Sequence, residues 1–291
     1  MKISIVIPTI NRPKKLNILL ESLINQYKGN FEVLIIDQSE DRNNSTLFNK
    51  TYIKYFHNPH IKNLCDAKNY GVKFTNGEYL GFVDDDVELP KNFISRLFYG
   101  VEKLNPLVLT GVEDGSFNKS YYIYILKKIF YRGIFYDNRI LYKNKRYPDY
   151  IETNKIFGGC SFFKSIVFKN LSFRSKSPFF INEDTDFSLT VKDKFKDKFY
   201  IDTNLKYTHH GETKRFNQKY YDGNDLINKL SSNIVTSKLL FKFHKKSYID
   251  NISLIWLLFG YFIVSIYLSF KYRKLRYLKI SLDSLINEPK K

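Results

Sequence analysis

The stretch Glu78-Tyr79-Leu80-Gly81-Phe82-Val83-Asp84-Asp85-Asp86 decides the fold. Its apolar run, residues 79–83, predicts a buried strand that ends in three adjacent carboxylates. Unpaired charge is costly to bury, so a counter-charge is expected there. Residues two apart in an extended chain point the same way, so Asp84 and Asp86 can face one cation and a polyphosphate while Asp85 faces elsewhere. Mg²⁺ or Mn²⁺ suits such carboxylates; the alternative is a solvated acidic turn before Pro90.

The composition indicates a large and strongly basic chain. Its 291 residues, 43% of them apolar, can form one large domain or one domain with an extension. Cys65 and Cys160 form no CxxC pair, which argues against a disulfide scaffold and a zinc site and fits a reducing compartment. The net charge of +18 predicts an anionic partner, for which nucleic acid, anionic lipid and phosphorylated substrates all qualify. Residues 3–7 predict a strand at the start rather than a signal peptide, so we expect the body of the protein in the cytosol.

A strand–helix–strand unit opens the chain. Residues 3–7 and 31–36 predict strands, and the leucine spacing after Pro13 predicts a helix between them. This order predicts a parallel sheet with a right-handed crossover. In such sheets ligands bind beyond the carboxyl ends of the strands. The side chains expected at that edge are Thr9, Arg12, Asp37 and the Asp84-Asp85-Asp86 triplet.

Later segments add less specific signals. Helices are predicted over 63–74, 91–104 and 184–191, and strands over 107–112 and 199–202. Glu183 and Asp184 stand at the start of a helix, where capping and the helix dipole alone favour acids. The adjacent Gly158 and Gly159 allow the backbone to approach a ligand closely, or form an ordinary turn. The pair His209-His210 is more often structural than ligating.

Residues 252–270 contain no charged residue and predict an apolar helix of about 28 Å. Lysine and arginine residues flank both of its ends. A single span with the body in the cytosol would place the more basic flank outside, so we prefer a monotopic or re-entrant helix. The alternative is a helix buried in the core or at a homodimer interface. Residues 121–150 interleave aromatic and basic side chains; a surface loop with a half-buried helix is favoured there over a membrane surface and over nucleic acid.

Six motifs in order resemble the inverting family 2 glycosyltransferases of the GT-A fold, over about the first 215 residues. They are Ile5-Val6-Ile7-Pro8-Thr9 with Asn11-Arg12; Ile35-Ile36-Asp37-Gln38-Ser39; Ala67-Lys68-Asn69-Tyr70-Gly71; Gly77 to Asp86; Gly158-Gly159; and Glu183-Asp184. The resemblance implies an α/β fold with a mixed, mainly parallel, Rossmann-like sheet flanked by helices. It implies a GT-A domain over 1–215, with a nucleotide-binding half at 1–110 and an acceptor half at 111–215. A basic, helical, membrane-associating extension would follow at 216–291.

The resemblance also implies roles for individual residues. The residues implied to bind the nucleotide-sugar are Pro8, Thr9, Arg12, Asp37, Lys68, Asp84 and Asp85. The implied metal ligands are Asp84 and Asp86, with His209 and His210 as looser matches. Asp184 matches the general base, with Glu183 beside it. Lys68 stands where the family usually has an arginine, and lysine lacks the planar fork of a guanidinium. Gln38 replaces a frequent second acid, which leaves the base preference open.

The implied activity is metal-dependent, inverting transfer of a sugar. The donor would be a UDP-, dTDP- or GDP-linked sugar, and Mg²⁺ or Mn²⁺ the cofactor. The acceptor would be a hydroxyl of a glycan or a polyprenyl-linked glycan, in cell-envelope polysaccharide synthesis at the cytoplasmic face of the membrane. No nucleic acid partner is expected. One rival, nucleotidyl transfer to a sugar phosphate, normally needs a glycine-rich loop after the first strand, and this chain has none there. The other rival is a non-catalytic, basic membrane-surface or nucleic-acid-binding protein on a degenerate GT-A scaffold.

Overall fold

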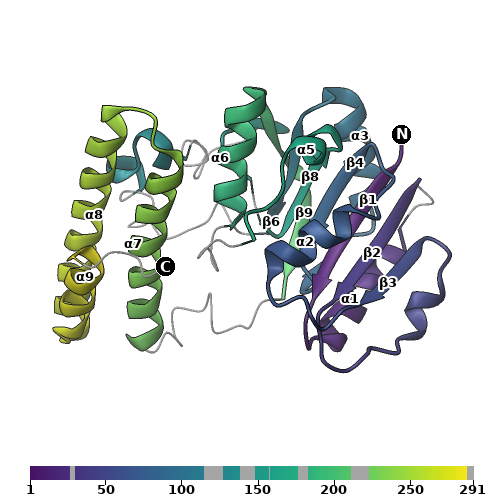
Figure 1. Cartoon of the computed structure of the whole chain (residues 1–291), viewed down its shortest axis with the longest axis horizontal. Coiled ribbons are helices and arrows are strands. Elements are labelled where there is room, and N and C mark those ends of the chain that lie inside the picture. Colours follow the sequence, from purple (N-terminus) through teal and green to yellow (C-terminus); the bar gives the residue numbers. More distant parts are fainter. Residues whose placement is uncertain are drawn as a thin grey trace. The chain divides into compact units, whose positions relative to one another are not determined.

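The computed structural model describes residues 1–26, 30–114, 127–137, 148–156, 158–175, 183–210 and 223–286 (Figure 1). The chain divides into two compact units. Unit 1 comprises Met1–Phe117, Asn144–Ser177 and Glu183–Gly211; unit 2 comprises Asn118–Lys143, Pro178–Asn182 and Glu212–Lys291. The domain boundary at residue 215 stays a prediction.

Unit 1 is built on a mixed sheet. Within the described residues its strands are β1 (Ile3–Thr9), β2 (Phe31–Asp37), β3 (Ile53–His57), β4 (Tyr79–Val83), β5 (Val87–Glu88), β6 (Val108–Glu113), β7 (Tyr150–Thr153), β8 (Cys160–Lys164) and β9 (Phe199–His209). Their order is β3-β2-β1-β4-β8-β6-β9-β5, and β7 pairs with β9. The run β3-β2-β1-β4 is parallel, whereas β8 is antiparallel to both of its neighbours, β4 and β6. The carboxyl ends of β1, β2 and β4 therefore meet at one edge.

Helices cover both faces of this sheet. They are α1 (Pro13–Ile24), α2 (Leu64–Val72), α3 (Phe93–Leu104), α5 (Ile166–Asn170) and α6 (Glu183–Phe195), with the 3₁₀ turn η1 at Thr46–Asn49. Side chains alternate along β1, so Ile5 and Ile7 join the core beneath α1 and α3. Val6 faces the opposite way and packs in the second core with residues of α2, α5 and α6. The predicted mixed α/β sheet flanked by helices is confirmed, although β9 extends well beyond the predicted strand over 199–202.

Unit 2 is helical in the part that the structure describes. It contains the turn η2 (Gly133–Phe135) and the helices α7 (Gly223–His244), α8 (Tyr248–Tyr272) and α9 (Arg276–Ile286). α7 and α8 pack side by side, and α9 packs against both (Figure 1). Ser247 and Asp250 form a capping box that begins α8. α8 contains the predicted apolar helix over 252–270, and its length and mean hydropathy of 2.0 would suffice to cross a membrane.

The aromatic and basic segment predicted at 121–150 is described only in part. Residues 127–130 are helical and precede η2, while 121–126 and 138–147 lie outside the described residues. Phe130 is buried against Gly260 of α8, where an added Cβ would come within 2.5 Å of the phenyl ring. The Trp256 indole N–H donates to the carbonyl of Ile129 at 2.8 Å. This part of the segment therefore packs on α8.

Candidate active site at the carboxyl ends of β1, β2 and β4

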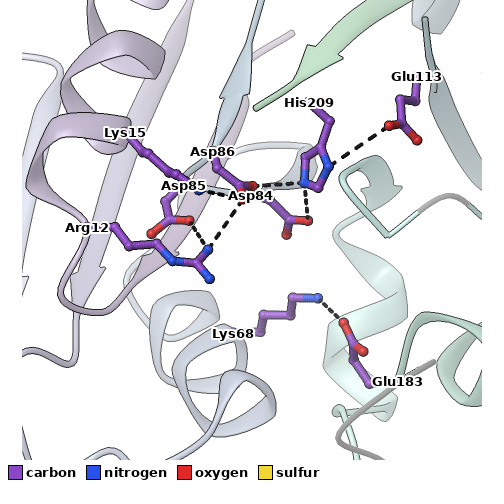
Figure 2. Close-up of polar contacts among 9 residues, drawn as sticks. All are labelled: Arg12, Lys15, Lys68, Asp84, Asp85, Asp86, Glu113, Glu183 and His209. Carbon is purple, nitrogen blue, oxygen red and sulfur yellow. Dashed lines mark hydrogen bonds and ion pairs between the residues drawn. The ribbon is translucent and has the colours of Figure 1, made fainter. Parts of the chain in front are cut away.

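Asp85 is held by the loop that follows β1. Thr9 Oγ1 donates to Asp85 Oδ2 at 2.7 Å. Arg12 Nη1 donates to Asp85 Oδ1 at 3.1 Å (Figure 2). Arg12 also reaches Asp86 Oδ2 at 3.4 Å, and Lys15 Nζ lies 3.6 Å from the same oxygen. Both oxygens of Asp85 are thus engaged by Thr9 and Arg12, whereas Asp86 offers only one oxygen, Oδ2, to Arg12 and Lys15.

Asp84 and Asp86 lie beside His209, a residue far from them in the sequence. β5 pairs with β9 so that Val87 lies opposite His209, which places His209 beside the triplet. His209 Nε2 lies 2.8 Å from Asp86 Oδ1 and 4.0 Å from Asp84 Oδ2. One ligand atom from each of these three residues lies within 4.8 Å of the others. Glu113 is 4.0 Å from the other ring nitrogen, Nδ1.

Electrostatics differ among these neighbours. The pKa of Asp84 is raised to about 6, chiefly by burial; the charges of Glu183 and Asp86 act in the same direction, and those of Lys68 and His209 act against it. Burial also acts to raise the pKa of Asp86, but the hydrogen bond and charge of His209 hold it below its ordinary value. The same hydrogen bond raises the pKa of His209. The Asp84 carboxylate is therefore the one whose negative charge the protein supports least.

This donor set fits a divalent cation. Two carboxylates and an imidazole offer oxygen and nitrogen ligands, which suit Mn²⁺ and, through the oxygens, Mg²⁺. A bound cation would also relieve the charge that raises the pKa of Asp84. His210 is placed differently, because its Nε2 lies 2.6 Å from Glu88 Oε2. Its backbone N–H donates to the Asp86 carbonyl at 2.7 Å, so His210 positions the loop rather than adding its ring to the cluster.

Lys68 is fully buried beside Asp84. Its Nζ lies 3.0 Å from Glu183 Oε1 (Figure 2). Its ammonium also lies over the ring of Phe173, 5.0 Å from the ring centroid. Burial acts to lower the pKa of Lys68, but Glu183, Asp84 and Asp184 together raise it, so the amine stays charged. The role near a ribose or diphosphate that the family resemblance implies for Lys68 stays a prediction; in the structure its amine pairs with Glu183. Sequence reasoning missed this pair, whose partners are 115 residues apart.

Asp184 lies in the first turn of α6, next to Glu183. Its Oδ1 accepts a hydrogen bond from the Thr185 backbone N–H at 2.7 Å. A Cβ added at Gly158 would lie 3.2 Å from Asp184 Oδ2, and the Gly159 carbonyl accepts the Asp84 N–H at 3.1 Å. The glycine pair therefore lets the backbone lie close to Asp184 while it fixes Asp84.

Asp37 forms a separate corner of the same edge. The β1–β2 register places Asp37 opposite Thr9, and Pro8 opposite Ile36. Asp37 is buried; its carboxylate accepts hydrogen bonds from Tyr55 Oη at 2.7 Å and from the Ser39 N–H at 2.9 Å. The sequence pattern did not mark Tyr55 as a partner of Asp37. Its only signal was its place close to the aromatic residues Tyr52 and Phe56, in a stretch for which no helix or strand was predicted.

Comparison with known proteins shows which family the chain resembles. The model of "Glycosyl transferase family 2" matches residues 4–171, more than half of the chain. Glycosyltransferase GlyG of Streptococcus pneumoniae serotype 4 is 26% identical over 126 residues, which cover 40% of this chain and 42% of GlyG. The GalNAc(5)-diNAcBac-PP-undecaprenol beta-1,3-glucosyltransferase of Campylobacter jejuni is 34% identical over 102 residues, 33% of each chain. The match spans less than half of the length of either relative.

A solved structure shares the fold. The mannosyltransferase PcManGT of Pyrobaculum calidifontis, determined in complex with GDP-Man and Mn²⁺, has a TM-score of 0.61 to this chain. The likeness covers 98% of this chain and 86% of that one, at 10% sequence identity. At this identity it supports the GT-A architecture and says nothing by itself of substrate.

Proposed function

The chain belongs to glycosyl transferase family 2, and from this premise we propose that it transfers a sugar from a nucleotide-diphospho-sugar to a hydroxyl group with inversion at the anomeric carbon. The observation that carries the proposal is the convergence of Asp84, Asp86 and His209 at the strand ends, within 4.8 Å of one another. The buried pair of Lys68 and Glu183 connects this cluster to the first turn of α6, where Asp184 lies.

The residues of the chain divide the work of the reaction. Asp37 and Thr9 would face the nucleoside, since they lie side by side at the ends of β2 and β1. Asp184 would accept the proton of the acceptor hydroxyl while that oxygen attacks the anomeric carbon. The bond to the nucleoside diphosphate breaks on the opposite face, so one displacement inverts the configuration. Lys68 would keep Glu183 paired, so that the charge of Glu183 does not oppose ionised Asp184.

Asp84, Asp86 and His209 would hold Mn²⁺ or Mg²⁺. When bound, the ion neutralises charge that develops on the departing nucleoside diphosphate. Asp85 is already engaged by Thr9 and Arg12, so we assign it to positioning of the β1 loop. Arg12 and Lys15 add positive charge next to the same edge, which favours an anionic ligand.

The acceptor is proposed to be a glycan or a lipid-linked glycan of the cell envelope. The name of the Campylobacter jejuni relative describes an undecaprenyl-linked acceptor. The apolar helix α8 and the net charge of +18 fit work at the cytoplasmic face of a membrane. A non-catalytic GT-A scaffold is not favoured, because it gives no reason for carboxylates, His209 and the Lys68–Glu183 pair to converge at one edge.

The first experiment is thermal stabilisation by UDP, dTDP and GDP, each with and without Mn²⁺ or Mg²⁺. A ligand at about 100 times its Kd adds about 2.7 kcal/mol to the free energy of unfolding. We expect one nucleotide to raise Tm, more strongly with metal, and thereby to name the donor class. Absence of any shift across the panel would contradict the proposal.

Asp184→Asn tests the proposed base. The amide keeps the size of the carboxylate but cannot accept the proton, so turnover should fall by about 10²- to 10⁴-fold. Nucleotide stabilisation should stay as in the wild type, which separates loss of chemistry from loss of binding. Asp193→Asn is the matched control, since it makes the same carboxylate-to-amide change on an exposed residue of α6. Turnover of Asp184→Asn at the wild-type rate would remove Asp184 from its role.

A further inference from the structure

The polarity of α8 is reversed relative to an ordinary helix of a water-soluble protein. Its buried side carries Asp250, Ser253, Gly260, Ser265 and Ser269 around Leu257. Its exposed side carries an apolar stripe, by which we mean Ile252, Ile255, Phe259, Ile263, Tyr267 and Phe270. The spacing of three or four residues places the stripe along one face of the helix. Ile255 is 68% exposed and Phe270 81% exposed, so these apolar side chains face outward.

Two serines on the buried side of α8 have hydrogen-bond partners. Ser265 Oγ donates to the Phe262 carbonyl at 2.7 Å. Ser269 Oγ donates to the Ser265 carbonyl at 2.8 Å and accepts the Leu278 N–H of α9 at 3.1 Å. The bond between Leu278 and Ser269 joins α9 to this side of α8, and the other two bonds stay within α8. The stripe is therefore the side that unit 2 leaves outward, and an apolar area of this kind marks a membrane or protein contact.

The neighbours of α8 argue against a full crossing of a bilayer. α7 and α9 pack along α8 and carry charged residues. Lys238 of α7 donates to the carbonyls of Ser284 and Leu285 at 2.9 and 2.6 Å, which joins α7 to the end of α9. A crossing would carry Lys238, Lys242 and Asp283 toward the hydrocarbon, at about 2.5–3.5 kcal/mol for each charge near its centre. A helix that lies in the plane immerses only the stripe and leaves α7 and α9 on the aqueous side.

The basic residues at both ends of α8 indicate what kind of partner contacts the stripe. Exposed Lys245 and Lys246 precede α8, and exposed Lys271, Arg273 and Lys274 follow the stripe. No acidic residue occurs in the sequence between Asp250 and Asp283, and Asp250 is buried. Two copies joined stripe to stripe would bring these cationic ends near one another, in either orientation, with no carboxylate between them. An anionic bilayer instead offers hydrocarbon to the stripe and headgroups to both ends, at about 1 kcal/mol per basic residue.

We infer that unit 2 docks on an anionic lipid bilayer with α8 parallel to the membrane plane, the apolar stripe in the hydrocarbon boundary and the two basic ends on the headgroups. This is a statement about membrane binding and does not rest on the proposed transfer reaction. Its experiments use no nucleotide or sugar, so they fail or succeed independently of the activity.

Vesicle co-sedimentation of the full chain tests the surface. The vesicles are phosphatidylcholine alone, or phosphatidylcholine and phosphatidylglycerol in equal parts. We expect binding to the anionic vesicles and weaker binding to the neutral ones. Ile255→Asp with Phe259→Asp should reduce binding by at least ~10-fold, because two exposed apolar side chains lose their burial in lipid. Ile18→Asp makes the same kind of change on an exposed isoleucine of α1 and should leave binding unchanged.

Depth of insertion separates an in-plane helix from a spanning one. Trp256 is the single tryptophan of the chain and lies on α8. In a Trp256→Phe background, Ile263→Trp and Phe270→Trp move the probe along the helix. Quenching by lipids brominated at shallow or deep carbons should report the same shallow depth for all three positions. A spanning helix would instead place the probe at 263 much deeper than the probe at 270.

Three outcomes would overturn the inference. A deep probe at 263 alone would show a crossing helix. Equal binding of the Ile255→Asp, Phe259→Asp variant would show that the stripe does not contact lipid. A stable dimer that this variant dissociates, with no vesicle binding by the wild type, would assign the stripe to a second copy. Unchanged Tm of the variant, which alters exposed positions, guards against loss of folding.

Discussion

At the two ends of the parallel strands of unit 1, the surroundings shift the pKa of a carboxyl group in opposite directions. At the amino end, Glu32 of β2 accepts hydrogen bonds from Ser4 Oγ at 2.7 Å, the Asn76 N–H at 2.9 Å and Lys54 Nζ at 2.9 Å. Lys2 Nζ adds an ion pair at 3.2 Å. Burial acts to raise the pKa of Glu32, but these partners lower it to about 2. At the carboxyl end, burial and neighbouring acids raise the pKa of Asp84 to about 6.

The difference teaches how to separate a structural acid from a functional one. Each Glu32 oxygen has donors supplied by the fold, so its negative charge needs nothing from outside. Asp84 lies beside Asp86 and near Glu183, and Lys68 and His209 offset their charge only in part. A fold that leaves a carboxylate short of positive charge at the carboxyl ends of its parallel strands is a candidate to bind a cation from solution.

The largest effect is expected for Asp86→Ala. Loss of one of the clustered ligand atoms should weaken metal-dependent nucleotide binding by about 10²-fold. Isothermal titration with nucleotide in the presence and absence of Mn²⁺ measures it. Glu88→Ala is a fair control, because Glu88 is an acid of the next strand that pairs with His210 outside the cluster. Equal affinity of Asp86→Ala and wild type would remove Asp86 from the site.

Glu32→Gln should act on stability alone. The amide leaves Lys2 and Lys54 without their carboxylate, so the free energy of unfolding should fall by about 2 kcal/mol. Urea denaturation reports this loss, and nucleotide affinity should remain that of the wild type. A change in affinity without a change in stability would reverse the distinction drawn between the two ends.

Asp84→Asn should raise the free energy of unfolding, whereas Glu32→Gln lowers it. Neutral Asn removes a half-buried charge that partial desolvation and its acidic neighbours disfavour, so the protein without ligand should become more stable by about 1 kcal/mol. The gain is modest, because 33% of the Asp84 side chain remains exposed and solvent screens the repulsion. Metal should then no longer raise Tm. A protein destabilised by this substitution would show that Asp84 is a satisfied structural acid like Glu32.

The smallest effect is the acid dependence of stability. The pKa of Glu32 is about 2 in the folded protein and near 4.5 when unfolded, so its contribution is complete above pH 4.5 and falls as pH drops toward 2. Between pH 7 and pH 4 the wild type should lose less than ~1 kcal/mol through this group. Glu32→Gln cannot lose it, so the stability gap between the two proteins should narrow on acidification. A difference in stability that widens on acidification would contradict the lowered pKa of Glu32 in the folded protein.

The sequence by itself determined the first strand–helix–strand unit and the character of the strand-end edge, but it did not indicate the strands β3, β7 and β8. The apolar run before Asp84 had to be a buried strand, and the alternation of strand and helix had to produce a parallel unit with its polar ends together. Pattern within a few residues is enough for such features, because backbone geometry fixes which way neighbours in a strand point. The triplet itself differs from the expected extended chain: residues 85–86 form a turn in which the Val87 N–H donates to the Asp84 carbonyl at 3.3 Å, and this turn separates Asp85 from Asp84 and Asp86.

Only the tertiary structure decided which distant groups meet. His209 reaches Asp86 because β9 pairs with β5, and Lys68 reaches Glu183 because α2 and α6 cover the same face of the sheet. The sequence marked residues 252–270 as apolar, but only packing showed that α8 turns its serines inward and its isoleucines outward. Such contacts join residues far apart along the chain, so they follow from strand order and helix rotation, which no local pattern specifies.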